Sequence, residues 1–257
     1  MSTLLLNGET VSYSLHGPAG APVLLFANSL GTDYSLWDYQ ASRLLSQYRV
    51  LRYDARGHGG SSVSTTFVTL AQLGGDVIGL LDALEVEQVH FCGISMGGMI
   101  GLWLAIHAGE RLNTLVVANS AARIGTAEGW RTRAELTATG MDAIADGAAS
   151  RWFTADFIAR SPELVQRYVE GLRKCSPAGY ASGCQALAEA DLRDAISTIK
   201  TPTLIIAGSH DPVTTVDDAL FMQSNIPDAV LEQLDASHLS NLEAPVEFTH
   251  LLQEFLR

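Results

Sequence analysis

The sequence predicts an α/β protein with a mostly parallel, doubly wound sheet and an inserted helical lid, and two observations support this. Short apolar runs rich in β-branched residues alternate with segments of helical spacing along most of the chain. Over residues 124–195 the alternation stops, and amphipathic helical segments follow one another. We therefore expect a core formed by residues 1–123 and 196–257, with residues 124–195 as the lid.

Buried parallel strands are predicted wherever a short apolar run is followed by a helical segment. These runs are residues 23–27, 50–53, 89–92, 114–118, 203–207 and 229–234. Ahead of them, residues 3–6 and 10–16 flank Asn7-Gly8, a dipeptide suited to a tight hairpin turn. The sheet is therefore expected to begin with an antiparallel pair of strands.

Helices that cover this sheet are predicted by the spacing of apolar residues over 70–84 and 248–255. Inside the lid, Ser161, Pro162 and Glu163 have the pattern of a helix start, with Ser161 as the cap. Open α/β sheets bind ligands beyond the carboxyl ends of their strands. We therefore expect the lid to cover that edge of the sheet.

Composition and charge favour a folded protein that acts on a small molecule. The 257 residues, 47% of them hydrophobic, suffice for one large domain, and no apolar run is long enough to cross a bilayer. A formal net charge of -12 argues against nucleic acid or an anionic membrane as a partner. Residues 1–11 show no secretory signal, so we expect a cytoplasmic protein. The sequence leaves the oligomeric state open.

No sequence pattern for a metal or a cofactor is present, and we expect neither. There is no GK[ST] phosphate loop, no HExxH and no paired CxxC, and the three cysteines, Cys92, Cys175 and Cys184, are scattered. Gly57-His58-Gly59-Gly60 is glycine-rich like a phosphate loop, but no helix is predicted directly after it.

A candidate nucleophile lies in Gly93-Ile94-Ser95-Met96-Gly97, between a predicted strand and an apolar helix. A strand, a tight turn and a helix would project the Ser95 hydroxyl at the carboxyl edge of the sheet. Serine is a poor nucleophile at neutral pH, so it needs a general base, and that base needs a carboxylate to orient it.

The candidate base is His238 and the candidate carboxylate is Asp211, because each follows a predicted strand at the same sheet edge. The order Ser95, Asp211, His238 is the one expected of a triad on this kind of sheet. His210 is the alternative base, although it would have to point away from the adjacent Asp211, and Asp235 is the alternative carboxylate.

Attack on a carbonyl creates an oxyanion, which requires fixed N–H donors. The N–H of Met96, directly after the nucleophile, is one candidate. The second is expected from the loop after residues 23–27, where Leu30 is our choice and Ser29 the alternative.

Several stretches together resemble the capped α/β-hydrolases over the whole chain. They are residues 28–31, 54–61 and 93–98, Asp211, and Ser237-His238. Within that family the sequence is most similar to the 3-oxoadipate enol-lactonases, in residues 26–31, 119–125 and 151–154. Many family members have His-Gly where this chain has Asn28-Ser29, and the enol-lactonases share this departure.

The resemblance implies a substrate that is a five-membered unsaturated lactone with a carboxymethyl arm, opened through an acyl-enzyme to give 3-oxoadipate. The carboxylate of that arm needs a cation in a net-acidic protein. We expect Arg133 to bind it, with Trp130 and Trp152 as apolar walls. The alternative cations are Arg123, Arg131 and Arg151.

Fold and triad do not choose the substrate, so other functions stay open. A general carboxylesterase, a perhydrolase or a carbon-carbon bond hydrolase are the alternatives on the same scaffold. Haloalkane dehalogenases and epoxide hydrolases of this fold have, as the resemblance implies, an aspartate where this chain has Ser95. A small-molecule receptor without catalysis is the alternative from another class.

Overall fold

An eight-stranded sheet in the order β1-β2-β4-β3-β5-β6-β7-β8 forms the centre of the computed structural model, which describes residues 2–6, 8–64 and 67–257. The strands are β1 (Ser2–Leu6), β2 (Glu9–His16), β3 (Val23–Ala27), β4 (Arg49–Tyr53), β5 (Val89–Ile94), β6 (Leu112–Ala118), β7 (Thr203–Gly208) and β8 (Val230–Leu234). The pairs β1–β2 and β2–β4 are antiparallel, whereas the other pairs are parallel. The predicted fold class is confirmed.

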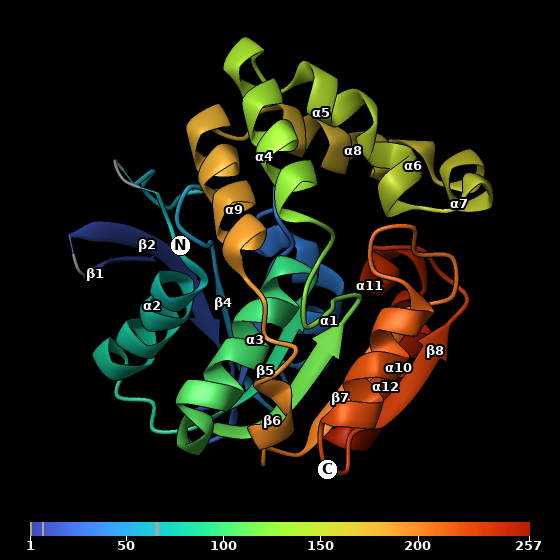
Figure 1. Cartoon of the computed structure of the whole chain (residues 1–257). Helices are drawn as coiled ribbons and strands as arrows, with labels where there is room; N and C mark the ends of the chain where they lie inside the picture. Colours follow the sequence, from blue (N-terminus) through green and yellow to red (C-terminus); the bar gives the residue numbers. More distant parts are fainter. Residues whose placement is uncertain (1, 7, 65–66) are drawn as a thin grey trace.

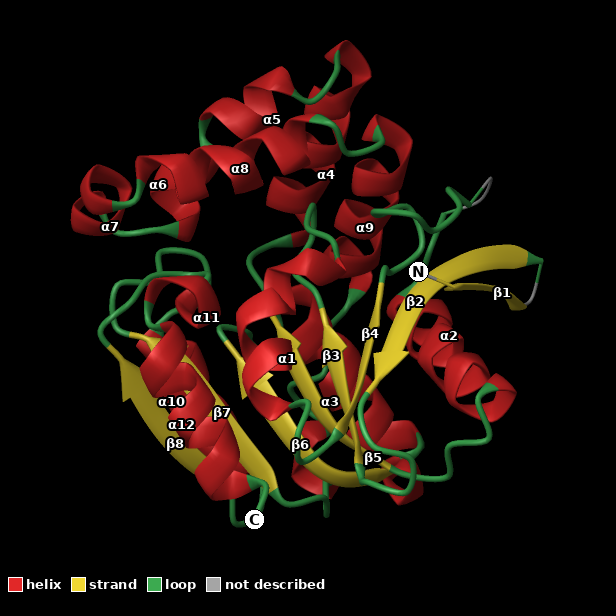
Figure 2. Ribbon diagram, turned by 180° about the vertical axis from the view of Figure 1, so that it is seen from behind, coloured by secondary structure: helices red, strands yellow, loops and turns green. Residues whose placement is uncertain are grey.

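Helices cover both faces of the sheet. The core helices are α1 (Asp38–Leu44), α2 (Leu70–Ala83), α3 (Met96–His107), α10 (Val216–Asn225), α11 (Ser240–Glu243) and α12 (Pro245–Phe255), with short 3-10 turns η1 (Tyr34–Trp37), η2 (Gly109–Arg111) and η4 (Ile196–Thr198). Helix α3 lies in front of the sheet and α1 behind it in Figure 1, and Figure 2 shows the opposite side. Because α3 contacts β3, β5 and β6, its N-terminus is fixed over the middle of the sheet.

Between β6 and β7 the described chain contains helices and no strand. These lid helices are α4 (Ala127–Leu136), η3 (Thr137–Thr139), α5 (Asp142–Asp146), α6 (Ala148–Trp152), α7 (Ala155–Arg160), α8 (Pro162–Arg173) and α9 (Pro177–Glu189). They lie together above one end of the sheet, as Figures 1 and 2 show. The β6 arrow in Figure 1 points to that end, so the lid helices cover the carboxyl edge.

The sequence-based expectations differ from the structure in details with physical causes. β8 is an edge strand, and Val230, Glu232 and Gln233 are exposed, so the prediction that this run is buried was wrong. Ser161 precedes α8 but makes no side-chain cap hydrogen bond, because its backbone (φ -135°, ψ 48°) departs from the extended form of a capping residue. Gly8 has the positive φ of a turn, whereas Asn7 lies outside the described residues.

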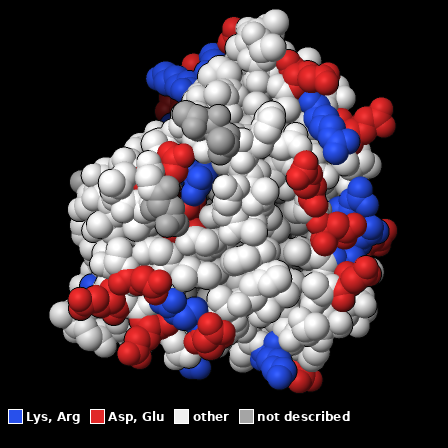
Figure 3. Space-filling view, turned by 60° about the vertical axis from the view of Figure 1, so that its left-hand side comes forward, with Lys and Arg blue, Asp and Glu red and all other residues white. Residues whose placement is uncertain are grey.

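Figure 3 shows one face of the molecule, on which acidic and basic side chains lie in small mixed groups and a broad area carries neither. This face therefore has no large surface of a single charge sign.

Within the described residues, no helix combines the length and the apolar character needed to span a membrane.

Candidate active site

Ser95 occupies the sharp turn between β5 and α3, with φ 56° and ψ -118°. A residue with a side chain rarely adopts this positive φ, and such strain typically costs about 1 to 3 kcal/mol. The turn is possible because its neighbours lack side chains. A Cβ at Gly97 would lie 2.3 Å from the carbonyl oxygen of Ala27, and one at Gly93 would lie 2.1 Å from that of Gly97. The two glycines therefore let the turn pack tightly and present the serine.

The structure brings Ser95, His238 and Asp211 together in one hydrogen-bonded row. Nε2 of His238 lies 2.9 Å from Oγ of Ser95, and Nδ1 lies 2.8 Å from Oδ2 of Asp211. All three residues are buried. The carboxylate can only accept, so Nδ1–H donates to it, which leaves Nε2 free to accept the serine proton.

A ring of donors fixes the Asp211 carboxylate. Oδ1 accepts from the backbone N–H groups of Val213 (2.7 Å) and Thr214 (3.1 Å). Oδ2 also accepts from the Thr214 hydroxyl (2.7 Å) and from Nδ2 of Asn119 (3.0 Å). Burial works to raise the pKa of Asp211, but the charge and hydrogen bond of His238 and these side-chain donors outweigh it and lower that pKa. Asp211 is therefore held as the anion.

Neither Asn119 nor Thr214 was predicted from the sequence to take part in the site. Asn119 directly follows β6, at the same sheet edge as Asp211 after β7. A polar residue at that position of the neighbouring strand was the available signal.

The alternative base and carboxylate pair with each other instead of joining the site. Nε2 of His210 lies 2.7 Å from Oδ1 of Asp235, and their side chains are 56% and 93% exposed. Both face solvent. The buried histidine within reach of Ser95 is His238.

Ser95 and His238 line a small cavity beneath the lid helices. Its other lining residues are Ser29, Leu30, Trp130, Arg133, Arg151, Trp152, Tyr180 and Val213. The volume of about 20 Å³ is room for roughly one water molecule. A larger ligand can therefore enter only if lining side chains or the lid helices move.

The two expected oxyanion donors come from segments beside Ser95. Met96 is the first residue of α3, where backbone N–H groups have no partner inside the helix. Leu30 and Ser29 both line the cavity. The choice between their N–H groups therefore stays a prediction.

Two arginines from the lid helices reach the cavity. The guanidinium of Arg133 lies over the Trp130 ring, 5.3 Å from its centroid, and Arg151 donates to the carbonyl of Ile144 at 2.7 Å. Burial, followed by the charge of Arg133, lowers the pKa of Arg151. Among the described residues, neither guanidinium forms an ion pair with a carboxylate. Two half-buried cations thus line the same cavity as Ser95.

Of the other arginines considered for the substrate carboxylate, neither lines this cavity. Arg123 pairs with Asp191 at 3.4 Å on the surface, and Arg131 is exposed. Arg151, which no sequence pattern favoured over the other arginines, lines the cavity together with Arg133. Trp130 and Trp152 both line the cavity as expected of apolar walls.

Tyr180 of α9 was not predicted to belong to the site. Burial raises its pKa to about 12, against the opposing charges of Arg133 and Arg151. Its phenol is therefore neutral near pH 7 and supplies a polar group to the cavity that Arg133 and Arg151 also line.

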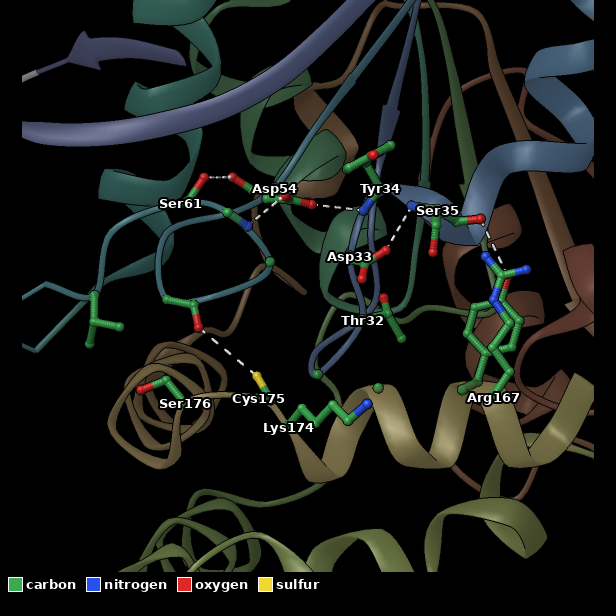
Figure 4. Close-up of a pocket in the computed structure, with 17 residues that line it drawn as sticks. Thr32, Asp33, Tyr34, Ser35, Asp54, Ser61, Arg167, Lys174, Cys175 and Ser176 are labelled. Carbon is green, nitrogen blue, oxygen red and sulfur yellow. Dashed lines mark hydrogen bonds between the residues drawn. The ribbon is translucent and has the colours of Figure 1, made fainter. Parts of the chain in front are cut away.

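A second, larger cavity of about 550 Å³ lies between α8 and the loops that follow β3 and β4 (Figure 4). Asp54 accepts hydrogen bonds there from the N–H groups of Tyr34 (2.8 Å) and Gly60 (2.9 Å), and Lys174 stands at the end of α8. None of Ser95, Asp211 and His238 lines it. A ligand in this cavity would not contact the candidate nucleophile.

The sequence and structure are similar to known hydrolases over nearly the whole chain. Residues 22–245 match the model of the alpha/beta hydrolase fold family. Two 3-oxoadipate enol-lactonases of Acinetobacter baylyi are 47% and 48% identical, covering 98% and 99% of this chain and 94% and 96% of theirs. The crystal structure of the enol-lactonase from Burkholderia xenovorans superposes with a TM-score of 0.97 at 41% identity, covering 99% of both chains.

Proposed function

The chain belongs to the alpha/beta hydrolase family, and we propose that it is a serine hydrolase that opens the ring ester of 3-oxoadipate enol-lactone. The similar enol-lactonases and the row formed by Ser95, His238 and Asp211 support this proposal. The implied partner is a small lactone that carries a carboxylate. The same three residues would also serve a general carboxylesterase, which needs no binding site for a substrate carboxylate.

In the proposed reaction, Nε2 of His238 takes the proton of the Ser95 hydroxyl while Oγ attacks the lactone carbonyl. The N–H groups of Met96 and Leu30 stabilise the oxyanion that forms. Its collapse breaks the bond between the carbonyl carbon and the ring oxygen, and this oxygen stays on the acyl chain as an enolate. The enolate takes up the proton held by His238 and becomes the ketone, which leaves His238 neutral again. Water, activated by His238, then hydrolyses the acyl-enzyme and releases 3-oxoadipate.

The leaving group explains why a serine, a histidine and an aspartate suffice. An enolate is more stable than the alkoxide of a simple ester, so its departure needs little assistance from an acid. Asp211, kept anionic by its donors, stabilises the imidazolium that forms in each half of the reaction.

The observation that carries the choice of substrate is the pair of guanidinium groups of Arg133 and Arg151 in the Ser95 cavity. Two sheltered cations without a carboxylate partner repel each other, and a bound anion relieves that repulsion. The carboxylate of the lactone arm is such an anion. Trp130 and Trp152 would cover the apolar ring.

The test is the initial rate of hydrolysis of 3-oxoadipate enol-lactone by the purified protein, beside an uncharged aryl ester and a Ser95→Ala control. We expect kcat/KM on the lactone to exceed that on the ester, and Ser95→Ala to lose both activities. A protein that cleaves the ester and leaves the lactone intact would be a general carboxylesterase. A protein inactive on both would fit the receptor alternative.

A further inference from the structure

The loop that carries His238 is held by a hydrogen bond on each side of the histidine, and one of the two comes directly from the lid helices. After His238, the N–H of Leu239 donates to the carbonyl of Trp152 at 3.0 Å. Before it, the N–H of Ser237 donates to Oε2 of Glu243 at 2.9 Å. The candidate base is thus held between two backbone hydrogen bonds, and one of them depends on a side chain.

Glu243 connects this loop to the lid helices through the same carboxylate. Oε1 accepts a short hydrogen bond from the hydroxyl of Thr154, and the N–H of Thr154 lies 3.3 Å from both carboxylate oxygens. Thr154 caps α7 by accepting from the N–H of Phe157 at 3.2 Å. Two residues earlier, Trp152 lines the Ser95 cavity. Glu243 therefore connects the segment that carries Trp152 to the loop that carries His238.

The environment of Glu243 specifically suits a carboxylate. The residue is 5% exposed and ends α11. In the described part of the chain its partners are neutral N–H and O–H donors, and no ion pair with a cation is found. In Glu243→Gln, the side-chain NH2 group would face one of the groups that now donate to Glu243. Two donors cannot pair, so a buried polar group would be left without a partner.

We propose that Glu243 is a positioning residue that keeps the His238 imidazole aligned with Ser95 and couples this alignment to the lid segment Trp152–Thr154. Glu243 is not among the residues that line the Ser95 cavity. A substrate can enter the cavity of about 20 Å³ only if the residues around it move. Because Glu243 connects the segment that carries Trp152 to the loop that carries His238, both return to their places together when the site closes. The inference rests on the proposed serine hydrolase function.

The test is Glu243→Gln, with Glu247→Gln as the matched control because Glu247 is an exposed glutamate in the next helix. We expect Glu243→Gln to lower kcat per active site about 10- to 100-fold on both the enol-lactone and an aryl ester, since both reactions use His238 and small misalignments of reacting groups cost factors of this size. Glu247→Gln should keep the activity of the wild-type protein.

Active sites are counted by the initial burst of p-nitrophenol from p-nitrophenyl acetate, so that folding and positioning are separated. A merely structural role would reduce the burst amplitude and leave kcat per site unchanged, and that result would overturn the inference. If the wild-type protein itself cleaves neither substrate, the proposed function fails, which is a different result.

If Glu243→Gln does not fold, kcat per active site is measured for Thr154→Val instead, with Thr154→Ser as its control. Valine removes the hydroxyl that Glu243 accepts from and keeps the shape, whereas serine keeps the hydroxyl. We expect Thr154→Val to lower kcat per site about 3- to 30-fold, a smaller loss than in Glu243→Gln because the hydrogen bond from Ser237 to Glu243 remains. We expect Thr154→Ser to remain near the wild-type value. Equal kcat in both variants would overturn the proposal.

Discussion

The side-chain amide of Asn119 donates a hydrogen bond of 3.0 Å to the carboxylate of Asp211, 92 positions later in the chain. The same amide donates to the carbonyl of Ser237 at 3.1 Å, and its oxygen accepts from the hydroxyl of Ser240 at 2.5 Å. Asn119 therefore ties the end of β6 to the proposed orienting carboxylate and to the loop of the base.

Asn119→Ala is expected to lower kcat about 10-fold or more, because a hydrogen bond to a charged group contributes roughly 1.5 to 3 kcal/mol. KM should change little, since Asn119 does not line the Ser95 cavity. Steady-state kinetics and a thermal unfolding curve measure both effects. An unchanged kcat in a protein with lowered Tm would mean that Asn119 only stabilises the fold.

Ser95→Ala, Asp211→Asn and His238→Ala should each lower kcat by several orders of magnitude, about 10⁴-fold or more, and leave folded proteins. The three residues form one hydrogen-bonded row, so combining the changes should not multiply the losses. Circular dichroism checks the fold and kcat checks the chemistry. Near-normal turnover in any single variant would remove that residue from the triad.

Arg133→Ala should lower kcat/KM on the enol-lactone roughly 10- to 150-fold, the equivalent of one charged hydrogen bond. An uncharged aryl ester should be cleaved nearly as before, because it makes no use of the cation. We expect the same selective loss in Arg151→Ala and none in Arg131→Ala, since Arg131 is exposed outside the cavity. Equal losses on both substrates would indicate that the arginine supports the lid helices.

Asp54 predicts a pH dependence of stability. Burial raises the pKa of its carboxyl to about 6, against the hydrogen bonds from Gly60 and Tyr34. The unfolded chain releases this proton near its ordinary pKa of about 4, so unfolding becomes easier as pH rises from about 4 to about 6. The full effect is roughly 3 kcal/mol.

Urea unfolding of the wild-type protein and Asp54→Asn between pH 4 and pH 7 measures this contribution. As pH rises, the unfolding free energy of the wild-type protein should fall relative to that of Asp54→Asn. Parallel curves over that interval would show that Asp54 titrates normally.

The residues with the strongest sequence signals are those whose position follows from local structure. Ser95 lies between a strand and a helix, and Asp211 and His238 follow strands that end at the same edge, so periodicity and turn residues alone could place them. For the same reason the fold class was predictable. The core and lid boundaries, the oxyanion N–H groups and the cytoplasmic location stay predictions.

Residues that act through long-range packing could not be found in this way. Arg151 enters the cavity and Arg123 does not, because the packing of the lid helices turns one inward and pairs the other with Asp191. The bond from Thr154 to Glu243 joins residues 89 positions apart. No local pattern encodes such a contact.

The most direct test of the central claim is the rate at which a fluorophosphonate labels Ser95 in the presence and absence of 3-oxoadipate enol-lactone, read by peptide mass mapping. We predict a label on Ser95, slowed by the lactone in proportion to its occupancy and absent from His238→Ala. Labelling that the lactone does not slow, or a label on another residue, would contradict the account.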